Sequence, residues 1–530
     1  MLEKLSKSEL EKLFDRKSFS RLAEMIEALG EAGSEDRYID FFSKNNLKKL
    51  VLSSASTIPK LQTARFWNQI ANGLSDAEKG LLEQQGVSFK SNEIALSCLN
   101  HQLREQGFPS FQKDVQNIGV AIKTLPGSAE PFLPLKEFQT GVYFEAMRQL
   151  EIENNRFLIQ MPTGSGKTRT AMEVVATVLK NQERCCVIWL AHTIELIDQA
   201  ISCFEHVWAH MGNKDLELRV LDGQREGLST EITGSAFIIS TFQSLHKYHT
   251  KNQSVISELA KNIELVVVDE AHMAIAPTYK AITSALIKEN SKLIGLTATP
   301  GRKNIETGED ESENKELAEY FLNNLISLHC PPEKSVFDHL RELNILSYAQ
   351  TKEIGGSEFL VGLEEGQDIS HKILTKLGNE FERNLSIIGQ LKALINEGKK
   401  SIILFACSVE HSRFLTTILN FFEISSAHVD GTTSPTLRSE IIRQFKSGEI
   451  SVLSNYEVLA TGFDAPKTDV VFIARPTTSI VLYSQMIGRG LRGEAIGGTR
   501  NCTVVNVKDN LIGLPDPDSI FNYFDNYFVD

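Results

Sequence analysis

Residues 161–171 read MPTGSGKTRTA, and the sequence on either side predicts a strand before this stretch and a helix after it. The apolar run FLIQM, which ends at Met161, has the length of a buried strand. A helix is expected to begin at Lys167, because apolar side chains recur at helical spacing from Ala171 onward. A glycine-rich turn between a strand and a helix N-terminus forms a cradle for phosphate groups. The stretch therefore predicts a P-loop.

Each residue type in this predicted P-loop has a chemical role. Gly164 and Gly166 allow the backbone to wrap, so that its N–H groups face the β-phosphate. Lys167 supplies a positive charge to the β- and γ-phosphate oxygens, and the Thr168 hydroxyl is a ligand for Mg²⁺. The positions expected to bind ATP are Pro162, Thr163, Gly164, Ser165, Gly166, Lys167 and Thr168. Met161 departs from the first glycine of the general GxxxxGK[ST] pattern, and a flexible Gly/Ser turn is the alternative interpretation.

A second stretch, ELVVVDEAH at residues 264–272, places two acidic residues at the end of an apolar strand. Ligands of open parallel sheets bind at the carboxyl ends of the strands, where two neighbouring carboxylates are costly unless a cation is present. Asp269 is therefore predicted to hold Mg²⁺, and Glu270 to polarise the attacking water as a general base. The alternative is that these acids cap a helix. Their position after a P-loop, in the same series of strands, favours an ATP site.

The remainder of the chain divides into segments of different pattern. The first segment is helical, with capping boxes at Ser6–Glu9 and Ser75–Glu78. Apolar strand-like runs then alternate with helical stretches in two series, which is typical of parallel sheets covered on both faces. The predicted divisions are 1–125 for a helical accessory domain, 126–302 and 376–514 for two α/β domains, 303–375 for a connector or insertion, and 515–530 for an aromatic C-terminal tail.

Composition places the chain among ordinary globular proteins, with 42% hydrophobic and 23% charged residues. The formal net charge of −13 argues against a surface covered in basic patches, although a nucleic-acid strand can be held through backbone N–H groups and a few basic residues. Seven cysteines without a CxxC pair predict buried thiols in a reducing compartment. No apolar run is long enough to span a membrane, and the amino terminus is unlike a signal peptide, so a cytoplasmic location is expected.

Beyond the P-loop and the DEAH stretch, residues 132–510 resemble a superfamily 2 helicase or translocase of the DEAH type, because further motifs follow in that family's order. These motifs are LKEFQTGVY, IWLAHTIELIDQA, STFQSL, GLTATP, FACSVEH, ATGFDAP and QMIGRGLR. The resemblance implies an α/β fold class with two tandem RecA-like parallel-sheet domains and an α-helical N-terminal domain. It also implies hydrolysis of ATP, with Mg²⁺, in the cleft between the two RecA-like domains.

The resemblance also assigns roles to the matching residues. Nucleotide contacts are implied for Gln139, Gly462 and Asp464, and catalytic roles for Gln485, Arg489 and Arg492 beside Lys167 and Glu270. Coupling of the carboxylates to the second domain is implied for His272, Thr297 and Thr299. Nucleic-acid contacts are implied for His192, Thr193, Ser240, Thr241, Gln243, Ser408 and Thr461, with Gln199 on the helix that follows the first of these motifs.

Two of these groups have ordinary alternatives. Arg489 and Arg492 lie one turn apart on a predicted helix, so both can face a γ-phosphate as arginine fingers. Either arginine could instead form a surface salt bridge. The threonine and serine hydroxyls could instead cap helices.

The motif set is more similar to the motor subunits of type I and type III restriction enzymes than to DEAH-type RNA helicases, which usually carry SAT where this chain has TAT. This resemblance implies DNA rather than RNA as the partner, and a role in antiviral defence or DNA repair. A separate nuclease or another protein is an expected partner of the helical N-terminal domain. Two alternatives stay open, an RNA helicase and a nucleotide-switched binding ATPase that does not translocate. The switch would not need strand contacts at Thr193, Thr241 and Thr461.

Overall fold

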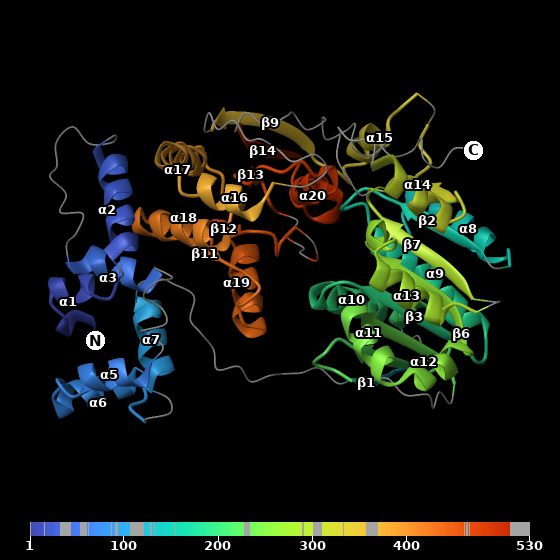
Figure 1. Cartoon of the computed structure of the whole chain (residues 1–530), viewed down its shortest axis with the longest axis horizontal. Helices are drawn as coiled ribbons and strands as arrows, with labels where there is room; N and C mark the ends of the chain where they lie inside the picture. The colour runs from blue at the N-terminus through green and yellow to red at the C-terminus, as the bar shows by residue number, and fades with distance from the viewer. Residues whose placement is uncertain are drawn as a thin grey trace.

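The computed structural model places the strands in two separate sheets (Figure 1). Sheet A has eight strands in the order β1-β4-β5-β3-β6-β7-β2-β8, and sheet B has six in the order β11-β12-β10-β13-β14-β9. The structure describes all residues except 1, 15, 32–43, 54–60, 62, 86, 91–93, 106–120, 128–129, 132, 154, 227–233, 289–290, 300, 302–309, 332, 357–368, 461, 463–464, 466 and 509–530.

Sheet A is parallel except at one edge, where β1 runs antiparallel to β4. Its strands are β1 (Ile122–Leu125), β2 (Arg156–Gln160), β3 (Cys186–Ala191), β4 (Leu216–Leu221), β5 (Ala236–Thr241), β6 (Ile263–Asp269), β7 (Lys292–Thr297) and β8 (Leu325–Ser327). Every residue of β3 and β5 is buried. A central parallel strand is apolar along its whole length because helices cover both of its faces.

Two groups of helices cover sheet A. They are α8 (Glu137–Leu150), α9 (Lys167–Asn181), α10 (Ile194–Met211), α11 (Phe242–Lys251), α12 (Gln253–Ala260), α13 (Pro277–Leu286) and α14 (Asp310–Tyr320), with the 3-10 helix η2 (Ala271–Met273). Helices α8, α9 and α10 share an apolar cluster with Val187 and Trp189 of β3. Helices α11, α12 and α13 share another with Ile188 and Leu190, so alternate residues of one strand face the two layers.

Sheet B is parallel at every described strand pair. Its strands are β9 (Tyr348–Gly355), β10 (Ile402–Phe405), β11 (Ser426–His428), β12 (Val452–Asn455), β13 (Val470–Ile473) and β14 (Asn501–Lys508). The accompanying helices are α15 (Val336–Glu342), α16 (His371–Leu377), α17 (Phe381–Asn396), α18 (Val409–Phe421), α19 (Pro435–Ser447), α20 (Ile480–Ile487) and η3 (Glu494–Ile496). This arrangement confirms the predicted fold class, an α/β chain with two tandem RecA-like parallel-sheet domains preceded by helices.

The two sheets extend beyond the ranges expected from the sequence. Strand β1 precedes residue 126, and the expected connector 303–375 contributes β8 to sheet A and β9 to sheet B. All three strands lie at sheet edges, and β1 and β9 expose most of their residues. They therefore lack the buried apolar run that a sequence pattern detects. The tail at 515–530 lies outside the described residues.

The N-terminal helices pack on helices of sheet B, although sheet A follows them in the sequence (Figure 1). They are η1 (Leu2–Lys4), α1 (Lys7–Glu11), α2 (Arg16–Glu31), α3 (Lys44–Ser53), α5 (Ala64–Ala71), α6 (Asp76–Gln84) and α7 (Ile94–Glu105). Both predicted capping boxes, at α1 and α6, are present. Helix α2 contacts α17 and α18, and one buried apolar cluster includes Met25 and Ile26 together with Leu415 and Ile418. The N-terminal helices and the second sheet thus share a core.

The cysteines are free thiols, and five of them, Cys98, Cys185, Cys186, Cys407 and Cys502, are buried. Burial raises the pKa of the Cys98 thiol to about 12, so the group is neutral and unreactive near neutral pH. Within the described residues, no group of three or more His, Cys, Asp or Glu side chains is placed to hold a metal ion. The same part of the chain contains no helix of the length and hydropathy that a bilayer span requires.

Candidate nucleotide site between the two sheets

The carboxyl edge of sheet A brings the sequence motifs together. In the register of the sheet, Gln160 of β2 lies beside Thr297 of β7, and Leu296 lies beside Asp269 of β6. Strand β3 follows next, with Leu190 beside Val268, so the segments after β2, β7, β6 and β3 emerge at the same edge. The P-loop and the DEAH carboxylates are therefore separated by only one strand. Strand order, which is a tertiary property, creates this proximity.

The P-loop has the backbone that phosphate binding requires. Gly164 and Gly166 have φ values of +87° and +88°, in the left-handed region that favours glycine. The Ser165 hydroxyl donates to the Pro162 carbonyl at 2.7 Å, which closes the turn. Met161 is buried, and its N–H donates to the Thr297 carbonyl at 3.1 Å. This residue therefore continues the strand pairing, and the position does not need the freedom of a glycine.

Three charged side chains meet below the P-loop. The Lys167 Nζ lies 3.9 Å from Asp269 Oδ1 and 3.9 Å from Glu270 Oε1. Both distances exceed hydrogen-bond reach, so the ammonium is shared between the carboxylates. Glu270 has a φ of 54°, and its N–H donates to Asp269 Oδ1 at 3.0 Å. His272 Nδ1 lies 3.4 Å from Glu270 Oε2.

Burial and charge act in opposite directions on these carboxyl groups. Burial raises the pKa of Asp269 to about 6, against the attraction of Lys167. Burial also disfavours the charged form of Glu270, but Lys167 and His272 outweigh it and lower the pKa of this carboxyl well below its usual range. Two buried carboxylates with one ammonium leave a site of net negative charge. Hard oxygen ligands and excess negative charge fit Mg²⁺, and Thr168, which could add its hydroxyl, directly follows Lys167 in the first turn of α9.

The segment after α20 forms the opposite wall of the site. A Cβ atom added at Gly488 would lie 2.6 Å from Thr163 Cβ, so the end of α20 touches the P-loop directly. A Cβ at Gly164 would lie 3.4 Å from Arg492 Cγ. Arg489 is 7% exposed, and its Nε donates to the Gln485 carbonyl at 3.2 Å. Burial lowers the pKa of Arg489 to about 10, which leaves the guanidinium charged near neutral pH.

Two family matches cover the two walls of this site. Residues 132–302 match the family described as type III restriction enzyme, res subunit, and residues 386–494 match the helicase conserved C-terminal domain. The chain belongs to the superfamily 2 helicases. Members of this family hydrolyse ATP, and the first match contains the P-loop and the DEAH stretch. The second match contains both Arg489 and Arg492 and ends before β14.

Individual relatives agree with this assignment. The protein irc3 of Schizosaccharomyces pombe, whose name describes a mitochondrial ATP-dependent helicase, is 27% identical over 391 residues, which is 72% of this helicase and 58% of irc3. IRC3 of Saccharomyces cerevisiae, also named as an ATP-dependent helicase, is 25% identical over 68% of this chain and 49% of its own length. The helicase thus spans about half the length of these relatives. The DNA-bound Type ISP restriction-modification enzyme LlaBIII has the same fold, with a TM-score of 0.50 and 17% identity over 75% of this chain and 30% of that chain.

Gln139, which the resemblance assigns to adenine, is engaged with the P-loop of the helicase. Its side-chain nitrogen donates to the carbonyls of Ser165 at 3.2 Å and Gly166 at 3.4 Å. Its side-chain oxygen accepts from the Lys136 N–H at 3.0 Å. The nitrogen end of the amide therefore supports the P-loop backbone, and the oxygen end caps the start of α8. The side chain is buried, and only a change of rotamer would present it to a base.

The predicted coupling residues form short local contacts. The Thr297 hydroxyl donates to the Thr299 carbonyl at 2.7 Å and accepts from the Thr299 N–H at 3.1 Å. The hydroxyl of Thr297 thus closes the turn that follows β7, the strand between the P-loop and the DEAH segment. His272 lies against Glu270, as described above. These contacts stay within two neighbouring segments of the first sheet, one after β7 and one after β6.

Three predicted nucleic-acid residues cap helices of the helicase. Thr193, Thr241 and Ser408 are the N-caps of α10, α11 and α18, and their hydroxyls accept from backbone N–H groups of the first turns. The alternative that these hydroxyls cap helices is therefore realised. Ser240 is buried and its hydroxyl donates to the Leu221 carbonyl at 2.9 Å, whereas Gln243 is exposed. Thr461 and Asp464 lie outside the described residues.

His192 lies closer to the nucleotide site than the resemblance implies. Leu190 of β3 pairs with Val268 of β6, and His192 and Glu270 are the first residues after these two strands. Burial lowers the pKa of His192, although the Glu270 carboxylate opposes this effect. The imidazole is therefore neutral near pH 7. Its position connects the segment after β3 with the DEAH carboxylates.

The structure adds contacts across the cleft that the sequence patterns did not assign. Glu195 of α10 forms an ion pair with Arg438 of α19. The side-chain nitrogen of Gln199, also on α10, donates to the Gly462 carbonyl at 2.5 Å. A Cβ at Gly462, whose φ is +65°, would lie 3.0 Å from Glu195 Cβ. The sequence patterns gave neither Glu195 nor Arg438 a role, and only their proximity in the tertiary structure reveals the pair.

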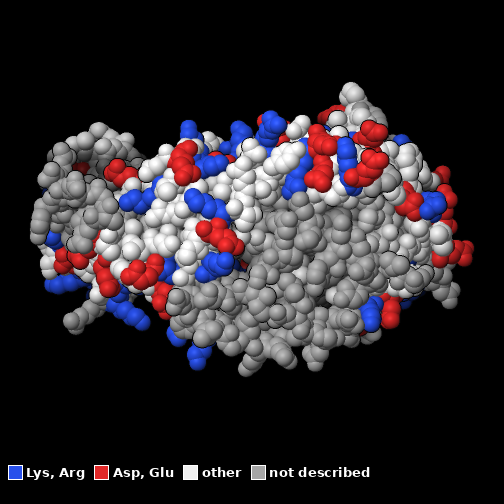
Figure 2. Space-filling model, turned by 90° about the horizontal axis from the view of Figure 1, so that it is seen from above, with Lys and Arg blue, Asp and Glu red and all other residues white. Residues whose placement is uncertain are grey.

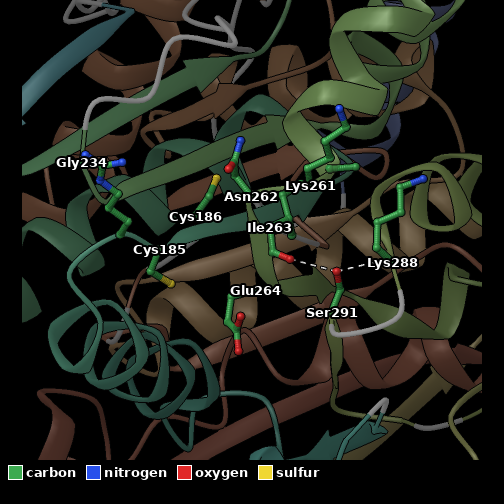
Figure 3. Close-up of a pocket in the computed structure, with 11 residues that line it drawn as sticks. Cys185, Cys186, Gly234, Lys261, Asn262, Ile263, Glu264, Lys288 and Ser291 are labelled. Atoms are coloured by element: carbon green, nitrogen blue, oxygen red, sulfur yellow. Dashed lines mark hydrogen bonds between the residues drawn. The ribbon is translucent and has the colours of Figure 1, made fainter.

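A pocket of about 720 Å³ lies at the opposite edge of sheet A (Figure 3). Cys186 and Ile263, the first residues of β3 and β6, line this pocket together with Lys261, Lys288 and Ser291. The Ser291 hydroxyl donates to the Ile263 carbonyl at 2.9 Å, and both lysines are exposed. Open parallel sheets bind ligands at the carboxyl ends of their strands. The candidate nucleotide site lies at the other edge, where the strands end.

Proposed function

We propose that this chain is an ATP-driven motor that moves along nucleic acid, with DNA as its track. The observation that carries the proposal is the contact between two walls from different sheets, where Gly488 lies on Thr163 and Arg492 lies on Gly164. A nucleotide bound between such walls would hold them together, and its hydrolysis would loosen them. Repeated closure and opening would move one nucleic-acid contact relative to the other.

In the proposed hydrolysis step, the first wall supplies Lys167 for the phosphate oxygens and Glu270 as the base that polarises the attacking water. Mg²⁺, held by Thr168 and Asp269, would offset the charge of the phosphates. Arg489 and Arg492 would stabilise the negative charge that develops on the transferred phosphoryl group. The carbonyl of Gln485 holds Arg489 in place. Gln139, Gly462 and Asp464 remain proposed nucleotide contacts.

The proposed nucleic-acid grip consists of helix N-termini. Thr193, Thr241 and Ser408 cap helices at the carboxyl edges of the two sheets. A helix N-terminus attracts phosphate through its free N–H groups and its partial positive charge, so the capping role and a phosphate contact are compatible. His192, Ser240, Gln243 and Thr461 are proposed as further contacts or supports of this grip, and Thr297 and Thr299 as the link to ATP. Contacts to phosphates carry no sequence information, so the motor would act on any sequence.

This mode of binding agrees with the charge of the surface. On the face shown in Figure 2, Lys and Arg side chains of the described residues are interspersed with Asp and Glu. Individual cationic side chains are therefore present on this face although the net charge of the chain is −13. Binding through helix N-termini and a few basic residues does not require an extended basic patch.

DNA is proposed rather than RNA because the first α/β unit matches a restriction-enzyme family and the restriction enzyme with the same fold is described as bound to DNA. On the same grounds we propose a role in antiviral defence or DNA repair, with a separate nuclease or other protein docking on the N-terminal helices. We also propose domain divisions at 125, 302, 375 and 514, with the edge strands β1, β8 and β9 joining the sheets from outside the α/β ranges. The buried free thiols suit a reducing compartment such as the cytoplasm.

The deciding experiment measures ATP hydrolysis by the full chain with Mg²⁺ alone and with single-stranded DNA, duplex DNA or RNA. A motor on DNA is expected to hydrolyse ATP faster with DNA than with RNA or no nucleic acid. A larger response to RNA would indicate an RNA helicase. Equal rates under all conditions would reject the motor and favour an ATPase that switches partner binding.

A further inference from the structure

One arginine of the N-terminal helices is bound into the second α/β unit. Arg21 of α2 donates from Nη2 to the Gly378 carbonyl at 2.7 Å, and its guanidinium carbon lies 4.0 Å from the ring centroid of Phe414 on α18. Burial lowers the pKa of Arg21 to about 10, so the side chain stays charged near neutral pH. Arg21 therefore joins a charge-assisted hydrogen bond and a cation–π contact in one position.

The carbonyl that Arg21 binds belongs to a buried polar cluster. The Gly378 carbonyl also accepts from the side-chain nitrogen of Asn384 at 3.0 Å. A Cβ at Gly378 would lie 3.0 Å from His411 Cβ, so the backbone at this position rests directly on the histidine. Asn384 and His411 are almost completely buried. Buried polar groups of this kind tolerate few alternative arrangements, because each lost hydrogen bond leaves a partner unsatisfied.

The hydrogen bonds of His411 determine its tautomer. The Cys407 N–H donates to His411 Nδ1 at 3.1 Å, so the ring proton is on Nε2. That Nε2–H donates to Asn384 Oδ1 at 2.7 Å. Asn384 can then donate to Gly378 only through its nitrogen, as observed. The orientation of each group thus follows from the next one along the chain of hydrogen bonds.

The chain of hydrogen bonds ends at the turn after β10. The His411 N–H donates to the Ser408 hydroxyl at 3.1 Å, and Cys407 immediately precedes this serine. Ser408 is the N-cap of α18 at the carboxyl edge of sheet B. This turn is one of the proposed nucleic-acid contacts of the second unit. A continuous path of hydrogen bonds and contacts therefore leads from the N-terminal helices to that contact.

We propose that Arg21 is a positioning residue through which the N-terminal helices set the geometry of the Ser408 turn, and thereby the strength with which the second unit holds nucleic acid. The inference rests on the proposed function, because it takes the Ser408 turn as a nucleic-acid contact. Arg21 contacts Gly378 and Phe414, and neither residue belongs to the P-loop or to the DEAH segment. Its loss should therefore change nucleic-acid affinity and leave hydrolysis without nucleic acid unchanged.

The test compares Arg21→Gln with Lys17→Gln in the full chain. Lys17 is an exposed residue one turn earlier on α2, so the control removes the same charge without touching the polar cluster. Three quantities are measured for each variant, namely the Kd for a fluorescent single-stranded DNA, the ATPase rate without DNA, and the melting temperature. Arg21→Gln should weaken DNA binding by about fivefold or more, with the ATPase rate without DNA unchanged. An affinity equal to that of Lys17→Gln, with only a lower melting temperature, would show a purely structural role.

A second variant approaches the cluster from its other side. Gly378→Ala keeps Arg21 but forces a methyl group against His411, and the same selective loss of DNA affinity is expected. This variant decides the matter if Arg21→Gln does not fold, and normal DNA affinity in a folded Gly378→Ala protein would overturn the proposal. A wild-type protein that binds neither DNA nor RNA would reject the proposed function itself. A wild-type protein that binds DNA, with both variants equal to it, would reject only the role of Arg21.

Discussion

Glu195 in the first turn of α10 forms an ion pair with Arg438 of α19, and the two helices belong to different sheets. Arg438 also donates to the Asp430 carbonyl at 2.8 Å, which holds its guanidinium on the second unit. The neighbouring bond from Gln199 to the Gly462 carbonyl lies in the same interface. The pair therefore connects the two units close to the segments proposed to contact nucleic acid and ATP.

Reversal of one charge in this pair should weaken the closed arrangement of the two units. Glu195→Arg and Arg438→Glu are each expected to lower the DNA-stimulated ATPase rate by about fivefold or more, because like charges would then oppose closure. The double variant, with the charges exchanged, should recover part of the loss. Steady-state ATPase assays with DNA measure all three proteins. A double variant as impaired as the sum of the single variants would show that the pair does not act across the cleft.

Gly488 offers a steric test of the same closure. Gly488→Ala places a methyl group 2.6 Å from Thr163 Cβ, so the P-loop and the end of α20 must separate. The ATPase rate is expected to fall by about tenfold or more, since a small displacement of catalytic groups has effects of this size. Gly389→Ala is the control, because a Cβ at Gly389 in α17 meets nothing within 4 Å. The control should keep full activity, and equal activity of Gly488→Ala would contradict direct packing of the two walls.

Lys167→Ala should abolish ATP hydrolysis while the protein stays folded. The substitution removes the cation that lies 3.9 Å from both carboxylates, and a loss of about a hundredfold or more is expected for a charge that acts on the phosphates. Lys180→Ala, at the exposed end of the same helix, is the matched control. Circular dichroism checks the fold and a phosphate-release assay measures the rate. Hydrolysis retained in Lys167→Ala would remove the P-loop assignment.

Glu270→Gln should separate ATP binding from hydrolysis. The amide keeps the shape of the side chain but cannot accept a proton, so turnover should fall by about a hundredfold or more while ATP still binds. The variant is expected to remain on DNA in the presence of ATP. Glu264→Gln, at the other end of the same strand, serves as the control. Nucleotide binding and DNA retention are measured separately from turnover, and an unaltered turnover number would contradict the role as base.

Protonation of His411 should destabilise the fold at mildly acidic pH. Burial, together with the charges of Arg383 and Arg21, holds the pKa of this histidine well below its usual value of about 6.5. The unfolded chain therefore binds a proton below about pH 6.5 that the folded chain does not bind. The free energy of unfolding is therefore unaffected by His411 above that pH. Below it, the free energy of unfolding falls with the pH, by at most about 1.4 kcal/mol per pH unit.

Urea unfolding from about pH 7.5 to about pH 5, an interval that spans the usual histidine pKa, measures this dependence. His411→Gln, which cannot be protonated, should show a smaller loss of unfolding free energy over the same interval. The difference between the two proteins isolates the contribution of this residue from that of other histidines. Parallel curves would show that His411 does not control the acid sensitivity.

Local sequence was sufficient to predict the P-loop and the strand that carries the DEAH carboxylates. The left-handed backbone at Gly164 and Gly166 depends on the absence of a Cβ, and a fully buried parallel strand must be apolar along its length. Both features are properties of a few consecutive residues. The capping boxes at Ser6 and Ser75 were predicted for the same reason, because each depends on contacts between residues three positions apart.

The sequence alone determined two parallel α/β units, the turn that is proposed to bind phosphate, and the presence of a helical N-terminal region. Only the tertiary structure decided that this region packs on the second unit, that Gln139 supports the P-loop, and that Glu195 meets Arg438. An amphipathic helix specifies that one face must be buried, but it does not specify the partner. Likewise, a threonine hydroxyl suits a helix cap and a phosphate equally well. Contacts between residues distant in the chain depend on the packing of whole elements, and no local pattern encodes them.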